Sequence, residues 1–71
     1  MKDRIIPFAP LDRLIRKAGA KRVSQSASEK LAEILEQIGL DISHQAIALA
    51  NHAGRSTVTQ SDFDAAMILR G

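Results

Sequence analysis

Basic side chains are the residues of this 71-residue chain with the clearest chemical potential. Five of them fall within ten positions that contain no acidic residue: Arg13, Arg16, Lys17, Lys21 and Arg22. Residues 1–22 hold seven bases against two acids, a balance of +5, whereas residues 23–71 hold three against six, a balance of −3. Such a segregated positive segment favours binding to a polyanion, and nucleic acid is the leading candidate. The alternative is a solvated helix face with no partner.

Catalytic and metal-binding patterns are not recognisable. The sequence has no cysteine, and its two histidines, His44 and His52, do not stand at ligand spacing. We find no phosphate loop and no nucleophile beside a base, and three short elements offer little room for a buried pocket. We therefore expect no enzyme activity, no metal, no cofactor and no small-molecule substrate.

The stretch from Ser26 to His52 must position everything else. It contains no proline and one glycine, and its apolar residues recur every three or four positions. This periodicity predicts one long helix of 27 residues, roughly 40 Å at about 1.5 Å per residue. The apolar stripe consists of Leu31, Ile34, Leu35, Ile38, Ile42, Ala46, Leu49 and Ala53.

A helix of this length exceeds the width of a compact 71-residue domain. The flanking segments are too short to cover its stripe, and an uncovered stripe would leave the helix marginal. We infer that a second copy crosses the first in an obligate dimer. Gly39, in the middle of the helix, would suit close approach of the partner's backbone.

Two shorter helices flank the long one. Pro10 fits the first position of a helix that runs to about Ala18 and stops at Gly19. Its apolar face is opposite the bases, as in a membrane-surface helix, but so short a helix would bind a membrane weakly. The segment before it is too short and too proline-rich for a signal peptide or a membrane span.

The remaining boundaries carry recognisable capping residues. Either Ser24 or Ser26, the latter with Glu29, would cap the long helix, and Gly54 would end it. Thr59 would start a third helix. From that helix we expect four residues to face inward: Phe63, Ala66, Met67 and Leu69.

Three segments carry a resemblance to a known family. IPFAPLDRLIRKAGAKRVS, the long helix and ALANHAGRSTVTQSDFDAAM together resemble the minimal single-domain histones of archaea and some bacteria, from about Ile6 to Leu69. The resemblance implies an all-α histone fold over residues 1–71, with a short helix, a loop, a long central helix, a loop and a short helix. It also implies a handshake dimer in which the first loop of one chain runs beside the second loop of the other.

The same likeness implies a set of DNA contacts. Arg22 matches the arginine that enters the minor groove, and Thr57 matches the threonine that holds it. Arg13 and Arg16 match bases near the DNA backbone, and Lys17, Lys21 and Ser56 complete the expected set. Ser56 stands where many members have lysine, and Ala48 and Asn51 replace positions that are often basic. These departures imply a lower DNA affinity or a different path of wrapping.

Two further contacts are implied. Leu49, His52 and Asp62 match the surface through which two dimers join, with His52 of one dimer reaching Asp62 of the next. Arg55 matches the partner of Asp62 within one chain. The plainer alternatives are a histidine that only favours its helix terminus and two separately solvated charges.

The expected function is that of a chromosome-associated, cytoplasmic architectural protein. Its homodimers, joined into tetramers or larger assemblies, would bend or wrap double-stranded DNA largely without sequence specificity and compact the nucleoid. We expect no membrane partner. The alternative is a histone-fold interaction module in a transcription or regulatory complex.

Overall fold

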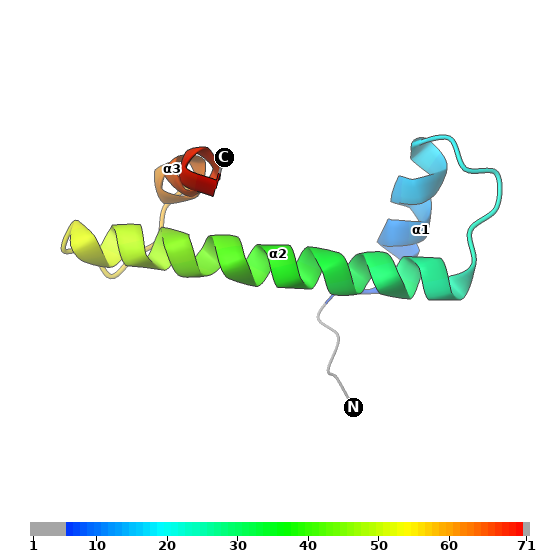
Figure 1. The fold of residues 1–71 in the computed structure, drawn as a ribbon, viewed down its shortest axis with the longest axis horizontal. Coiled ribbons are helices and arrows are strands. Elements are labelled where there is room, and N and C mark those ends of the chain that lie inside the picture. Colours follow the sequence, from blue (N-terminus) through cyan, green and yellow to red (C-terminus); the bar gives the residue numbers. More distant parts are fainter. Residues whose placement is uncertain (1–5, 71) are drawn as a thin grey trace, which may run out of the picture. The chain divides into compact units, whose positions relative to one another are not determined.

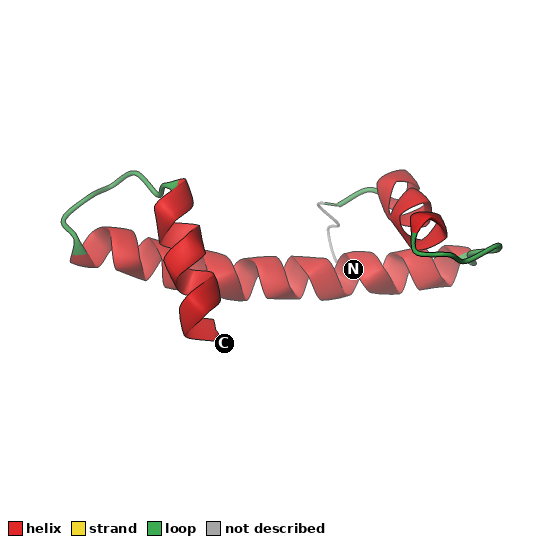
Figure 2. Ribbon diagram, turned by 90° about the horizontal axis from the view of Figure 1, so that it is seen from above, coloured by secondary structure: helices red, strands yellow, loops and turns green. Residues whose placement is uncertain are grey.

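The computed structural model describes residues 6–70 and contains three α-helices in this range (Figure 1). They are α1 (Phe8–Lys17), α2 (Gln25–His52) and α3 (Gln60–Arg70), and residues 6–70 include no strand. The predicted order of short, long and short helix is therefore confirmed. The two connecting loops stand out in Figure 2. The chain divides into two compact units, residues 1–37 and 38–71, which are described separately. The expectation of one domain over residues 1–71 stays a prediction.

Helix α1 begins two residues earlier than predicted. Pro7 is its N-cap and Phe8 its first residue, so Pro10 is the third helical residue and not the first. The prediction was wrong because the first four N–H groups of a helix all lack an intrahelical acceptor, which makes proline acceptable at any of the first three positions.

Helix α2 begins after Ser24, which decides between the two candidate caps. The Ser24 hydroxyl accepts a hydrogen bond from the Ala27 N–H at 3.1 Å. Ser26 is already helical, and the Glu29 carboxylate accepts a bond from the Gln25 side chain at 3.3 Å. The capping box proposed for Ser26 and Glu29 is therefore not the one that starts this helix.

Helices α1 and α2 end in the same way. Gly19 and Gly54 have positive φ angles of 122° and 76°. Each donates to the carbonyl three residues back at 2.9 Å, and the next residue reaches back five: Ala20 to Ile15 at 3.3 Å, and Arg55 to Ala50 at 2.9 Å. This pair of bonds is the Schellman motif, which satisfies the last carbonyls and turns the chain sharply.

The two cores are small. In the first unit Leu11 and Ala32 are buried, and in the second Ala46, Ala50 and Ala66 are buried. Among the described residues no large side chain is fully buried.

Several apolar residues that we expected to face inward are exposed. Of the four named on the third helix, only Ala66 is buried, while Phe63, Met67 and Leu69 are exposed. On α2, Ile34 is exposed and Ala53 lies at the surface. The prediction followed the stripe correctly but assumed that short neighbouring helices would cover it, and they cover mainly alanines.

Within residues 6–70, no helix combines the length and the apolar character that a membrane span requires.

Candidate nucleic-acid interface

The bases of α1 lie on its exposed side. Leu11 is buried and Ile15 half-buried, whereas Arg13, Arg16 and Lys17 are exposed. The last turn of a helix favours cations because its carbonyl groups carry partial negative charge, and Arg16 and Lys17 occupy that turn. Helix geometry therefore presents a row of positive charge to solvent.

The first loop continues this row. The Schellman turn at Gly19 leads directly into Lys21 and Arg22, both exposed, and half-buried Val23 then precedes the Ser24 cap. A β-carbon placed on Gly19 would meet nothing within 4 Å in this chain, so its positive φ is what requires glycine here. That observation favours the simpler of its two expected roles, the helix stop.

Arg16 differs from the other bases because it has partners within the chain. Its Nε donates to Asp12 Oδ1 at 2.9 Å, and its Nη1 donates to the Lys21 carbonyl at 3.1 Å. Within residues 6–70, no hydrogen bond or ion pair engages the side chains of Arg13, Lys17 or Arg22. The spacing of Asp12 and Arg16 was visible in the sequence, but the loop contact was not, because only the fold brings Lys21 back to α1.

The second loop is organised around Arg55. Its Nη1 and Nη2 donate to the two carboxylate oxygens of Asp62 at 2.9 and 2.7 Å, and Nη1 also donates to the Thr57 carbonyl at 3.0 Å. This bidentate geometry is the strong form of an arginine–carboxylate pair. Ser56 and Thr57 are exposed on the loop that Arg55 braces.

Asp62 also holds the start of α3. It accepts the Thr59 N–H at 2.8 Å and the Thr59 hydroxyl at 3.1 Å, and the residue is only 4% exposed. Hydrogen bonds from the Arg55 guanidinium, then from the Thr59 backbone, hold the pKa of this carboxyl well below its usual range. The same pairing raises the pKa of Arg55. Asp62 is therefore a charged structural centre that joins the second loop to α3.

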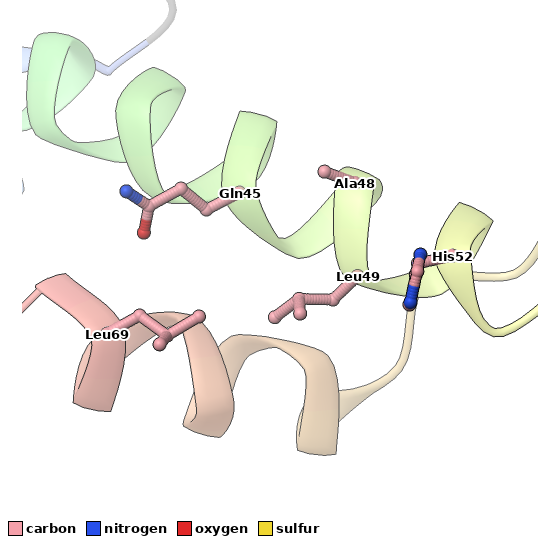
Figure 3. A pocket seen from close by; sticks show the side chains of 5 residues that line it. All are labelled: Gln45, Ala48, Leu49, His52 and Leu69. Atoms are coloured by element: carbon pink, nitrogen blue, oxygen red, sulfur yellow. The ribbon is translucent and has the colours of Figure 1, made fainter.

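A shallow apolar hollow lies on the second unit (Figure 3). It is lined by Gln45, Ala48, Leu49, His52 and Leu69. Leu49 and His52, two of the three residues expected at a dimer–dimer surface, are thus brought together on α2. Asp62 is not among the lining residues. Leu69 was not expected at this surface, and no sequence signal distinguished it from a core position.

Acidic and histidine side chains do not gather into a metal site in the part of the chain that the structure describes. No group of three His, Asp or Glu side chains among residues 6–70 is placed to hold an ion.

A long central helix joined by two braced loops to a short helix on each side is the layout of the histone fold. A model of the family described as histone-like transcription factor (CBF/NF-Y) and archaeal histone matches residues 4–67. The chain is 53% identical over 57 residues to the archaeal histone HAN1 of Thermococcus zilligii, a match that covers 80% of this chain and 85% of that one. It is 47% identical over 62 residues to probable archaeal histone 3 of Methanocaldococcus jannaschii, covering 87% and 92%. The chain belongs to this family of histone-like factors and archaeal histones.

Proposed function

We propose that this protein is a chromosome-associated histone whose self-associated copies bend or wrap duplex DNA with little dependence on base sequence. The observation that carries the proposal is the exposed positive row of α1 and the first loop in a chain with histone relatives over most of its length. DNA is the polyanion that histone relatives package, so the basic row has a partner of matching charge.

The chemistry of the row suits binding to the DNA backbone and minor groove. Arg13, Lys17, Lys21 and Arg22 are exposed cations, which neutralise phosphates without reading base edges. We assign Arg22 to the minor groove, where arginine responds to groove width and electrostatic potential. Thr57 on the second loop would hold it. Base identity would then influence binding only through how easily the duplex bends.

The second loop contributes little positive charge to this interface. Arg55 is paired with Asp62, and Ser56 offers a hydroxyl where many family members have a lysine. The loop therefore contributes hydrogen-bond donors and shape more than charge. We propose that the first loop and α1 supply most of the salt-sensitive part of DNA binding.

Self-association follows from the exposed apolar surface. Eight large apolar side chains are between 38% and 79% exposed: Leu14, Ile34, Leu40, Ile47, Phe63, Met67, Ile68 and Leu69. Transfer of such surface out of water gives about 25 cal/mol per Å², whereas the cores within each unit are built mainly from alanine. We propose that a second copy covers much of this surface, in the handshake arrangement that the family resemblance implies.

We further propose that dimers join through the face that includes Leu49 and His52. The hollow beside Leu69 provides apolar surface, and His52 lies at its edge (Figure 3). Asp62 Oδ2 accepts three hydrogen bonds and Oδ1 one, so Oδ1 is the atom with capacity for a further donor from a neighbouring dimer.

A mobility-shift titration with random-sequence duplex DNA across a salt series tests the function. We expect binding at low salt and a logarithmic affinity that falls steeply with salt, at about 0.9 per phosphate neutralised. Nuclease protection and the solution mass of the complex then give the length of DNA covered. If no duplex shifts at low salt, the proposal fails and a protein-binding module is the better interpretation.

A further inference from the structure

Arg16 joins the body of α1 to the first loop. Its Nε bonds to Asp12, one turn earlier on the same helix, at 2.9 Å. Its Nη1 bonds to the carbonyl of Lys21, five residues later, at 3.1 Å. The backbone carbonyl of Arg16 also accepts the Gly19 N–H at 2.9 Å. One residue therefore contacts the turn through its main chain and the loop beyond it through its side chain.

The geometry uses a property that only arginine has. A guanidinium holds its N–H groups in a rigid plane, so Nε can face a carboxylate while Nη1 faces a carbonyl in another direction. Asp12 fixes the side chain against the helix, and the outer part of the fork is then aimed at the loop. A lysine at this position would present a single ammonium on a flexible stem and could not hold both acceptors in the same way.

We propose that Arg16 is a positioning residue, which with Asp12 clamps the Lys21 carbonyl and so holds Lys21 and Arg22 in the orientation that the duplex requires. The proposal rests on the proposed DNA-binding function. It reassigns Arg16, which the family resemblance places near the DNA backbone, from a phosphate contact to a support of the neighbouring contacts. It also gives Asp12, the one acid beside the basic row, a part in DNA binding.

Asp12 provides a test in which charge and positioning predict opposite signs. Removing an acid beside the basic row strengthens DNA binding if only charge matters. If Asp12 positions Arg16, Asp12→Ala weakens binding despite the gain in net charge. We expect the affinity for random duplex to fall by about threefold to tenfold, since each dimer loses two surface pairs. The matched control is Asp64→Ala, which removes an exposed acid of α3 and is expected to leave binding equal or slightly tighter.

Arg16→Lys separates the clamp from a phosphate contact. It keeps the charge, so a direct phosphate contact predicts affinity close to that of the unaltered protein and an unchanged salt slope. The clamp predicts a loss similar to that of Asp12→Ala, also with an unchanged slope, and no further loss when the two substitutions are combined. Lys17→Gln is the reference for a lost phosphate contact, with a slope reduced by about 0.9 for each contact removed.

Loop order gives a readout that needs no DNA. Trypsin cleaves after Lys21 and Arg22, and the clamp predicts that Asp12→Ala and Arg16→Lys speed this cleavage several-fold, while Asp64→Ala does not. Circular dichroism and Tm check that each variant is folded. Unchanged cleavage in both clamp variants overturns the proposal, as does tighter DNA binding by Asp12→Ala. If the unaltered protein binds no duplex, the proposed function fails, and the proteolysis result still decides whether Arg16 orders the loop.

Discussion

Asp62 illustrates how one buried charge organises a whole segment. Its two oxygens accept bonds from the Arg55 guanidinium and from both the N–H and the hydroxyl of Thr59. A buried carboxylate is costly unless it is paired and hydrogen-bonded, and each of these hydrogen bonds favours its charged form. Loss of either partner would leave the other charge without compensation.

Acid is therefore expected to weaken the second unit. The pKa of Asp62 is lower in the folded protein than in the unfolded chain, where it is about 3.9. The stability that the pair contributes is fully present above the unfolded value and is lost as the pH falls from there through the folded value. Asp62→Asn should lower Tm at pH 7 and reduce the fall of Tm between pH 5 and pH 2. A variant with the same acid sensitivity as the unaltered protein would contradict this assignment.

Arg22 is the residue on which the minor-groove assignment depends. Arg22→Ala should weaken binding to all duplex sequences by roughly tenfold or more while leaving Tm unchanged, since the side chain is exposed. Arg22→Lys should recover only part of the loss, because an ammonium is more strongly hydrated than a guanidinium. Mobility shift on several unrelated sequences measures the effect. Equal affinity of Arg22→Ala and the unaltered protein would refute the assignment.

At the scale of elements, the two glycine-ended helices direct both loops. Each Schellman turn positions the residues that follow it, so that Ala20 leads into Lys21 and Arg22, and Arg55 faces Asp62. The turns depend on positive φ angles, which residues with a β-carbon adopt only with strain.

Gly54→Ala should destabilise the fold by roughly 1 to 2 kcal/mol, because alanine must adopt the left-handed conformation at φ 76°. Thermal or urea unfolding measures the loss. Gly54→Asn is the milder comparison, since asparagine tolerates this conformation better. An alanine variant as stable as the unaltered protein would show that the turn relaxes without cost.

Gly39→Ala is the matched substitution within a helix. A β-carbon there meets nothing within 4 Å in this chain, and Gly39 has no positive φ. Helix propensity alone predicts a gain of up to about 1 kcal/mol. If a partner's backbone approaches at this point, as the sequence analysis expects, we instead predict a loss and a weaker dimer. Unfolding curves at two protein concentrations distinguish the two results.

At the scale of the whole molecule, stability should depend on association. Because large apolar side chains remain exposed while alanines fill the cores, a single chain has little burial to offset its conformational entropy. Tm should therefore rise with protein concentration, and sedimentation should give at least twice the 7.7 kDa mass. A folded species of 7.7 kDa with a concentration-independent Tm would rule out obligate dimerisation.

Assembly beyond the dimer is expected to depend on His52. His52→Ala should lower the mass of the complexes formed on DNA while leaving the dimer folded, because the side chain is exposed in this chain. Asn51→Ala, one position away and also exposed, is the control. Mass measurement with and without DNA gives the result. Complexes of unchanged size would place the dimer–dimer surface elsewhere.

Much of this protein was predictable from local patterns. Apolar spacing identified the long helix, glycine and serine marked its ends, and the charge count separated a basic first segment from an acidic remainder. These features depend on residues near one another in sequence, and local propensity and helix periodicity determine them directly. The boundary of α1 was missed because proline is tolerated at several positions of a first turn.

Contacts between elements were decided only by the tertiary structure. Nothing in the spacing of Arg16 and Lys21 shows that a side chain reaches that carbonyl, and Leu69 was placed beside Leu49 and His52 by packing alone. The sequence by itself determined which residues are helical, basic or apolar. The fold determined which of them touch, because turn geometry and packing bring together groups whose separation along the chain carries no such information.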